Sequence, residues 1–167
     1  AAKQKKLDDA EKILAEYLAH EPKKLTERSR MEGELAKSYQ AQKDFVRMAP
    51  HADEGYAASK GLLKDAASRA RGLDEILDAG LLVYEAYRDN GNPRRAEAGL
   101  DAMRATAVAT GSKSFYYYSV DHKIKYLIET GRNPSALHLY KASMTDVDKE
   151  FPRTELKEDV LKRVNKH

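Results

Sequence analysis

Residues 83–100 read VYEAYRDNGNPRRAEAGL, and this stretch decides the fold. Gly91 is suited to the left-handed conformation that commonly ends a helix. Asn92 can then accept backbone hydrogens as an N-cap, and Pro93 fits the first helical position because its missing N–H would have no partner there anyway. The stretch therefore predicts one helix that ends and another that begins within three residues.

Apolar residues flank this turn at helical spacing. Val83 and Tyr87 lie one helical turn apart before the turn, and Ala96 and Leu100 lie one turn apart after it. Each pair marks a single buried face on its own helix. Because the connection is so short, we expect the two helices to run antiparallel and to bury these faces against each other.

The same punctuation returns later in the chain. Gly131 follows Gly91 by forty residues, and Asn133 and Pro134 have the composition to open another helix. Ala136 follows its glycine by five residues, as an alanine also does after Gly91. A fixed period of this size is the signature of a solenoid of stacked repeats.

Amphipathic patterns also predict helices before the first of these hairpins. Prolines and a glycine supply the expected stops, since proline cannot easily continue a helix and glycine commonly caps one. The predicted helices of this region are 6–20, ended by Pro22, then 24–47, ended by Pro50, and 52–71, ended by Gly72.

Composition narrows the class of protein. The 167 residues suffice for one domain with a sizeable core, and 41% hydrophobic with 34% charged residues is too apolar for disorder. No run approaches the ~18 uninterrupted apolar residues of a membrane helix, so we expect no membrane insertion. The 30 basic and 27 acidic residues are interspersed, and there is no cysteine to form a disulfide or a thiolate metal site. The compartment, cytoplasm or periplasm, stays open.

The residues of the two hairpins resemble the tetratricopeptide repeat. That family carries a large residue and an aromatic in a first helix, glycine at the turn, then alanine and an aromatic in the second helix. The matching residues here are Val83, Tyr87, Gly91, Ala96 and Leu100 in one repeat, and Leu127, Gly131, Ala136 and Tyr140 in the other. The period is nearer forty than the usual thirty-four residues, and tryptophan is absent, which marks a divergent relative.

The resemblance implies an all-α fold, a right-handed superhelical stack of antiparallel helix pairs with about seven helices. It implies one domain over 1–167, a fragment of a longer protein. Its predicted parts are 1–22 as the second helix of an incomplete repeat, 23–72 as a divergent helix pair, 73–111 and 112–151 as repeats, and 152–167 as a capping helix. A plain helical bundle is the alternative fold.

The resemblance also implies a concave groove lined by the first helix of each pair. The outward-facing positions that would bind a partner are Asp78, Leu81, Glu85, Arg88 and Asp89 before Gly91, and Tyr118, Asp121, Lys125 and Glu129 before Gly131. Their mixed charge suggests a partner segment of mixed charge with an apolar anchor. The alternative, that these are ordinary solvated faces, stays open because exposed charge is the default.

Aromatic residues are expected mainly in packing. Tyr87 and Tyr140 are predicted to fill contacts between repeats. The run from Phe115 to Tyr118 spans about 300° around a helix, so its four side chains cannot all face one core. At least one of them should face a groove or a partner.

No pattern predicts catalysis. The five histidines form no pair at the four-residue spacing of zinc helices, and the sequence has no glycine-rich phosphate loop and no nucleophile elbow. We therefore expect no enzyme, no cofactor, no catalytic residue and no metal site. The histidines are His20, His51, His122, His138 and His167.

The function predicted from these features is non-catalytic protein–protein interaction. The groove would hold a peptide or protein segment, and the chain would be the scaffolding or sensing part of a larger protein. A first alternative is a regulatory domain that binds a small ligand or a signalling peptide. A second is nucleic-acid binding through scattered basic residues, which the neighbouring acidic residues disfavour. Self-association through the N-terminal helix is a further possibility.

Overall fold

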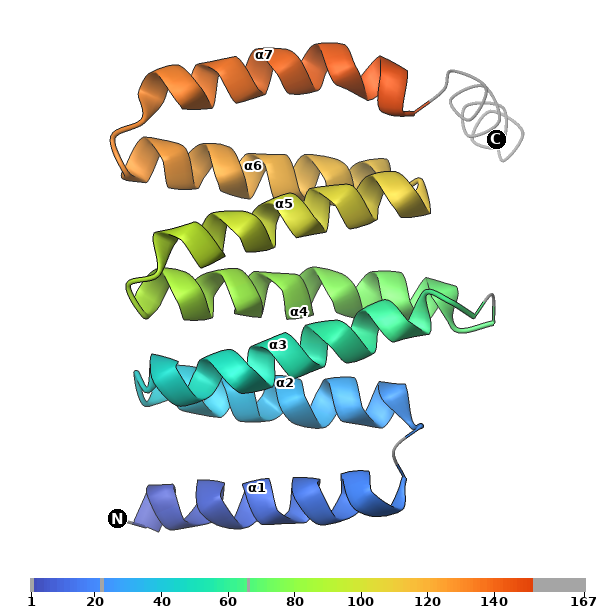
Figure 1. Ribbon diagram of the computed structural model, residues 1–167, viewed down its shortest axis with the longest axis vertical. Helices are drawn as coiled ribbons and strands as arrows, with labels where there is room; N and C mark the ends of the chain where they lie inside the picture. Colours follow the sequence, from blue (N-terminus) through green and yellow to red (C-terminus); the bar gives the residue numbers. More distant parts are fainter. Residues whose placement is uncertain (1, 22, 66, 152–167) are drawn as a thin grey trace, which may run out of the picture. The chain divides into compact units, whose positions relative to one another are not determined.

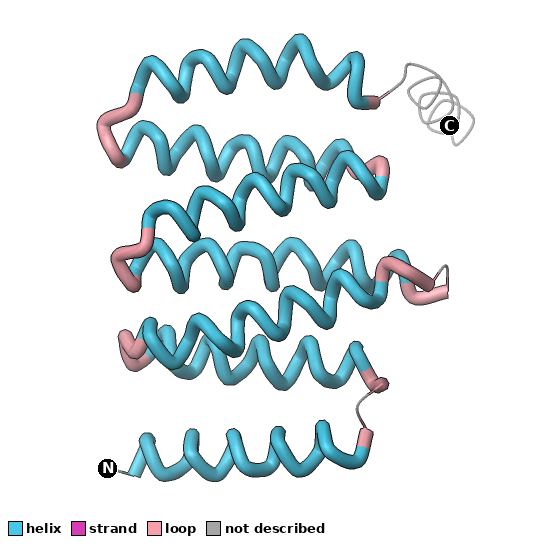
Figure 2. Tube along the Cα trace, in the orientation of Figure 1, coloured by secondary structure: helices cyan, strands magenta, loops and turns pink. Residues whose placement is uncertain are grey.

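The computed structural model describes residues 2–21, 23–65 and 67–151, and within these ranges all regular structure is helical (Figures 1 and 2). Its seven helices are α1 (Ala2–His20), α2 (Leu25–Ala41), α3 (Phe45–Leu62), α4 (Arg69–Asp89), α5 (Pro93–Thr110), α6 (Lys113–Glu129) and α7 (Asn133–Glu150). Neighbouring helices pack against each other, as α1 does on α2, α2 on α3, α3 on α4, and α6 on α7. The predicted all-α class is thus confirmed.

The chain forms two compact units, and their boundary falls inside α5. In the unit Ala1–Gly99, α2 packs on α3, α3 packs on α4, α2 also contacts α4, and α1 lies along α2 (Figure 1). In the unit Leu100–His167, α6 packs on α7. The predicted capping helix 152–167 lies outside the described residues.

Three turns share one conformation and recur every twenty residues. Gly91, Gly111 and Gly131 have φ of 71°, 70° and 74°, the left-handed region that only glycine adopts without strain. The residue after each glycine donates its N–H to a carbonyl five positions back, as Asn92 does to Tyr87 at 2.8 Å. This bond, with that of the glycine itself, makes the Schellman motif. The predicted stops at Gly91 and Gly131 are confirmed.

The helix starts after two of these turns differ. Asn92 accepts the N–H of Arg95 on its side-chain oxygen at 3.2 Å, as the sequence predicts for an N-cap. Asn133 is instead already the first residue of α7, and Arg132 precedes it without a side-chain cap. The second asparagine-proline pair therefore opens its helix through the preset φ of proline alone.

A fourth turn of the same kind lies where the sequence predicts continuous helix. Lys43 has φ of 58°, and the following Asp44 donates its N–H to the Tyr39 carbonyl at 3.0 Å. The Asp44 carboxylate then accepts the N–H of Arg47 at 3.1 Å and caps α3. The predicted helix 24–47 is wrong because a lysine, which carries no turn signal, takes the left-handed position.

Pro50 and Gly72, which were predicted to end helices, both lie inside helices. Pro50 is exposed within α3 and does not end this helix, whose N-terminus is capped by the Asp44 side chain. Gly72 lies within α4, and a Cβ there would come within 3.0 Å of the Leu62 side chain. Gly72 therefore permits the close approach of α4 to the end of α3.

Close approach also characterises the α2–α3 contact. A Cβ on Gly55 would meet the backbone N of Gly33 at 3.6 Å. One turn further, Ser59 donates to the Gly55 carbonyl at 2.9 Å, and its oxygen lies 2.7 Å from the Ser29 hydroxyl. Both serines are buried, so these bonds satisfy polar groups that water cannot reach.

The aromatic residues divide between core and surface. Phe115 and Tyr116 are buried, and the Tyr116 ring packs edge-on against Phe151 at 5.4 Å. Tyr117 is 43% exposed, which confirms that the run does not face one core. Tyr140 is 54% exposed, so its predicted role as a filled contact between repeats is wrong.

Candidate peptide-binding surface

A small cleft lies between α2 and α4, and we call it the α2/α4 cleft. Its volume is about 120 Å³. The lining residues recur at helical spacing on one face of each helix. They are Ser29, Arg30, Gly33, Glu34 and Lys37 from α2, and Glu75, Asp78, Ala79 and Leu82 from α4.

The cleft has an apolar part and a charged part. Gly33, Ala79 and Leu82 supply apolar atoms, and a Cβ added at Gly33 would meet no neighbouring atom within 4 Å. Glu34 and Asp78 are exposed. This combination of a small apolar recess and accessible charge is typical of a surface that binds a side chain of a partner.

Carboxylates outnumber cations around the cleft. Arg30 lies 3.6 Å from one carboxylate oxygen of Glu75, and Lys37 lies 3.2 Å from Glu34. Asp78 is the third acidic residue of the lining. The cleft therefore has three acidic and two basic side chains, which leaves one negative charge in excess. The second oxygen of Glu75 is buried and accepts no hydrogen bond within the described chain.

The predicted groove residues of α4 have different surroundings. Asp78 lines the cleft, Leu81 is half-buried, and Glu85 accepts a hydrogen bond at 2.8 Å from Gln40 of α2. Arg88 donates two hydrogen bonds, of 2.9 and 3.1 Å, to the Asp89 carboxylate, and this interaction raises the pKa of Arg88. Asp78 alone of the five predicted residues lines the cleft.

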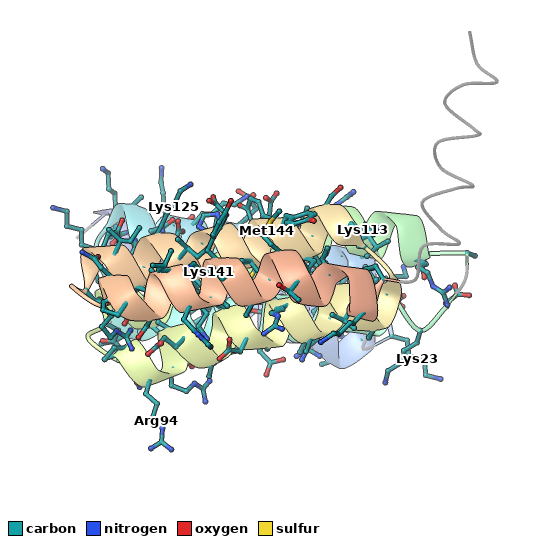
Figure 3. All side chains as sticks on the ribbon, turned by 90° about the horizontal axis from the view of Figure 1, so that it is seen from above. Lys23, Arg94, Lys113, Lys125, Lys141 and Met144 are labelled. Carbon is teal, nitrogen blue, oxygen red and sulfur yellow. The ribbon has the colours of Figure 1, made fainter. Side chains whose placement is uncertain are left out.

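The predicted residues of α6 lie in the other unit and interact locally. Lys125 pairs with Asp121 at 2.7 Å, and this contact raises the pKa of Lys125. The Tyr118 ring contacts the His122 ring with centroids 4.5 Å apart, and Glu129 is exposed. Lys125 projects outward from the surface of its unit (Figure 3). None of these four residues lines a described pocket.

Sequence reasoning missed an exposed apolar stripe on α7. Leu137, Tyr140 and Met144 are spaced by three and four residues and are 54%, 54% and 52% exposed. Met144 and the neighbouring Lys141 both reach the surface of their unit (Figure 3). The pattern of apolar residues was visible in the sequence, but the pattern alone does not separate a buried stripe from an exposed one.

A larger groove, which we call the α1/α2 groove, lies between α1 and α2. Its volume is about 360 Å³, and Ile13 on its edge is 61% exposed. Most of its lining is apolar. The lining residues are Leu7, Ala10, Ile13 and Leu14 from α1, and Arg30, Met31, Glu34, Leu35 and Ser38 from α2.

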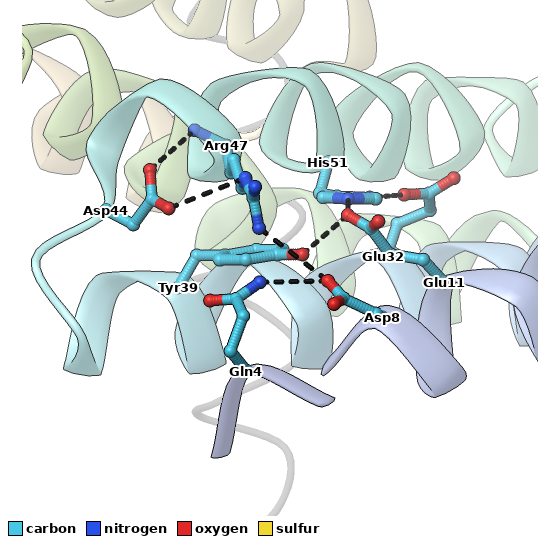
Figure 4. A network of polar contacts seen from close by, with 8 residues as sticks. All are labelled: Gln4, Asp8, Glu11, Glu32, Tyr39, Asp44, Arg47 and His51. Atoms are coloured by element: carbon cyan, nitrogen blue, oxygen red, sulfur yellow. Dashed lines mark hydrogen bonds and ion pairs between the residues drawn. The ribbon is translucent and has the colours of Figure 1, made fainter. Parts of the chain in front are cut away.

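A polar cluster joins the same α1 and α2 to α3 (Figure 4). His51 of α3 lies with Nδ1 2.7 Å from a Glu32 oxygen and with Nε2 3.0 Å from a Glu11 oxygen. Tyr39 donates its hydroxyl hydrogen to the same Glu11 oxygen at 2.6 Å. Because ionised carboxylates only accept hydrogen bonds, both ring nitrogens donate when the imidazole is protonated. The bond to Glu32 is the main cause that raises the pKa of His51.

The sequence carried no signal for this cluster. Its members are separated by 19 and 40 residues in the chain, so no local motif connects them. A search for two histidines four residues apart considers only neighbours on one helix. It could not find the contacts that His51 makes with residues of other helices. Within the described ranges, no group of three or more histidine, aspartate or glutamate side chains is placed to hold a metal ion.

Comparisons with known proteins give no relative for this chain. No family model matches the sequence, and no curated protein or solved structure matches it significantly. The resemblance to the tetratricopeptide repeat therefore stays a prediction. Across the part of the chain that is described, no helix combines the length and the apolar character that crossing a membrane requires.

Proposed function

We propose that the chain is a non-catalytic interaction module that holds a peptide segment of another protein against α2 and α4. The observation that carries this proposal is the α2/α4 cleft, an open recess with an apolar floor and a charged rim. At about 120 Å³ it is well below the ~300–1,000 Å³ typical of small-ligand sites. It suits a single side chain of a longer partner.

The chemistry of the cleft defines the peptide. Ala79 and Leu82 can pack against the aliphatic part of a side chain. Asp78 and Glu75 can attract a positive charge at its end, since the cleft carries an excess of negative charge. A lysine or arginine side chain combines both properties because its aliphatic stem is apolar and its end is charged. We therefore propose basic residues within the bound segment.

Membership in the tetratricopeptide-repeat family forms part of this proposal. The turns at Gly91 and Gly131 and the stacked helices support it. In that family the first helices of successive pairs line the binding surface, and α2 and α4 hold these positions in the proposed assignment. A role as a scaffolding or sensing part of a larger protein follows from the same assignment.

Gly33 allows a sharp test. A Gly33→Gln change places a side chain in the cleft without a clash, because the space beside Gly33 is open. Gly33→Ala is the matched control, which leaves the cleft nearly unfilled and removes the same helix-interior glycine. Random peptides displayed on phage are selected against the wild-type chain, and the enriched peptides are then measured against all three proteins.

The outcomes separate clearly. We expect enriched peptides to contain basic residues, to bind the wild type and Gly33→Ala alike, and to lose at least tenfold in affinity on Gly33→Gln. Asp78→Lys should weaken the same peptides by reversing a rim charge. Peptides that bind Gly33→Gln and Asp78→Lys as well as the wild type would disprove the placement of the site. A selection that enriches no peptide would contradict the function itself.

The α1/α2 groove favours the second candidate function, a regulatory domain that binds a small apolar ligand. Its volume of about 360 Å³ falls within the usual range of small-ligand sites, and its lining is mainly apolar. Binding of the dye 8-anilinonaphthalene-1-sulfonate tests this reading. A native chain that binds the dye, with binding lost in Ile13→Lys, would support it. Equal binding by both proteins would refute it.

A further inference from the structure

The attachment of α1 to the rest of its unit has little apolar content. Among the described side chains of α1, only Leu7 and Leu14 are buried, and Ile13 is mostly exposed. Two buried leucines contribute roughly 3–6 kcal/mol of apolar burial. Ordering a nineteen-residue helix costs conformational entropy of comparable or larger size. Other contacts must therefore help to hold α1 in place.

Those other contacts converge on one end of α3 (Figure 4). Glu11 of α1 contacts both Tyr39 of α2 and His51 of α3, at 2.6 and 3.0 Å. Asp8 of α1 lies 3.7 Å from Arg47, one turn before His51 on α3. The Tyr39 ring stacks on the His51 ring at 5.6 Å with the planes within 10°. The imidazole is thus fixed between the two carboxylates.

The two carboxylates beside His51 differ in their access to water. The Glu32 side chain is only 4% exposed, whereas the Glu11 side chain is 38% exposed. A neutral imidazole has one N–H, so it can donate to only one of them. The buried Glu32 has no alternative partner in water, so it must keep the donor. Glu11 can reach water, so it is the one that loses its bond.

The other charged groups around His51 do not change this balance. From α2 the facing groups are Glu32 and Tyr39, and from α1 the facing group is Glu11. Arg47 of α3 is shared between Asp8 and Asp44, at 3.7 Å from each. On the side of α3 that meets α4, Tyr87 contacts Asp53, and this contact does not involve His51.

We propose that α1 is a latched arm, held on α2 and α3 while His51 is protonated and released at the Glu11 contact when His51 loses its proton. Release uncovers the α2 wall of the α1/α2 groove, which includes Met31 and Leu35. Both carboxylates raise the pKa of His51 in the docked state. The latch is therefore fully closed below the ordinary histidine pKa of about 6.5 and opens as pH rises through the raised value.

The experiment is amide hydrogen exchange of the full chain between pH 6 and pH 9, corrected for the intrinsic effect of pH. We expect the corrected exchange rate of residues 2–20 to increase with pH in the wild type. The increase should be about tenfold for each unit by which the docking of α1 raises the pKa of His51. Exchange in 45–62 and 69–89 should not accelerate, because α3 and α4 stay folded.

Three variants identify the latch. His51→Gln carries no charge, so α1 should exchange quickly at every pH. His51→Lys keeps a positive charge, so α1 should exchange slowly up to pH 9. His138→Gln, at an exposed histidine of α7, should behave as the wild type does. Glu11→Gln cuts the latch on the α1 side only and should remove the pH dependence without disturbing the buried Glu32.

The proposal fails under either of two results. One is an α1 whose corrected exchange does not change with pH in the wild type. The other is a pH dependence that survives in both His51→Gln and Glu11→Gln. If His51→Gln unfolds the whole unit, the Glu11→Gln result decides, since that substitution removes a partly exposed charge from α1 itself.

Discussion

Tyr87 of α4 donates its hydroxyl hydrogen to the carboxylate of Asp53 on α3. Arg95 of α5 completes the contact, since it donates to the Tyr87 oxygen at 2.9 Å and its guanidinium lies 4.5 Å from the centre of the Tyr87 ring. The three residues come from three successive helices and all lie within the unit Ala1–Gly99. The Tyr87 hydroxyl therefore links α3 and α4 to the start of α5.

Removing this hydroxyl should destabilise the unit without changing its packing. We expect Tyr87→Phe to lower the free energy of unfolding by about 1–2 kcal/mol, because Asp53 loses a donor while the ring keeps its cation–π contact. Urea denaturation measures the change. Tyr117→Phe is the control, at a largely exposed tyrosine, and should have almost no effect. Equal stability of Tyr87→Phe and the wild type would show that water replaces the bond.

Alkaline pH should destabilise the first unit through Tyr39. Burial and the bond to Glu11 raise the pKa of Tyr39 to about 12, from 10 in the unfolded chain. The unfolded state loses this proton first, so the contribution of Tyr39 to stability is constant below pH 10 and falls between pH 10 and 12. The fall should approach 2–3 kcal/mol, about 1.4 kcal/mol per pKa unit.

Circular dichroism in urea at pH 8 to 12 measures this fall. Tyr39→Phe cannot ionise at this position and should show a smaller loss over the same range, although it is less stable at pH 8. A Tyr39→Phe curve parallel to that of the wild type would assign the alkaline loss to other tyrosines.

Lys43→Gly should stabilise the chain. Lys43 holds the left-handed conformation that glycine holds in the three other turns. Glycine relieves the steric strain at this position, but it also adds conformational freedom to the unfolded chain. We expect a net increase of about 0.5–1 kcal/mol in the free energy of unfolding. Gly131→Ala is the reciprocal change, and it should cost about 1 kcal/mol although a Cβ there meets no neighbour. Thermal unfolding measures both changes, and we expect a higher midpoint temperature for Lys43→Gly and a lower one for Gly131→Ala.

Pro50→Ala should also stabilise the first unit. Pro50 is the sixth residue of α3, where it removes a helical hydrogen bond and crowds the preceding turn. The cost of an interior proline is ~3 kcal/mol relative to alanine, so we expect a gain of about 1–3 kcal/mol in urea denaturation. An unchanged or lower stability would mean that α3 needs a bend at this point to fit α2 and α4.

The sequence predicted the turns at Gly91 and Gly131, but it missed the turn at Lys43 and the break between α3 and α4, which falls inside the predicted helix 52–71. Gly91 and Gly131 act through their own backbone freedom, which can be read from residue type. Lys43 takes the same conformation only because the helices on either side require it, and tertiary packing cannot be read from a single residue. For the same reason Pro50 and Gly72 were interpreted as stops, although capping at Asp44 and packing against Leu62 keep the helices continuous there.

The candidate site was predictable to a smaller extent. The resemblance to the tetratricopeptide repeat implied Asp78 as an outward-facing groove position on α4, but the sequence did not reveal that α2 supplies the other wall of the cleft. The contacts of His51 with Glu11 and Glu32 join three helices across large sequence separations. Such contacts follow from how helices stack and have no local pattern.

The turns at Gly91, Gly111 and Gly131 are equivalent, so a segment of the gene between two of them can be added or removed and still leave a turn of the same kind. Each turn forms from its own hydrogen bonds, so it does not depend on which helix comes next. Excising 92–131 would join Gly91 directly to Arg132, and the new junction would keep a left-handed glycine followed at once by a helix start. Unequal recombination can therefore lengthen or shorten such a chain by forty residues without breaking a reading frame or a turn.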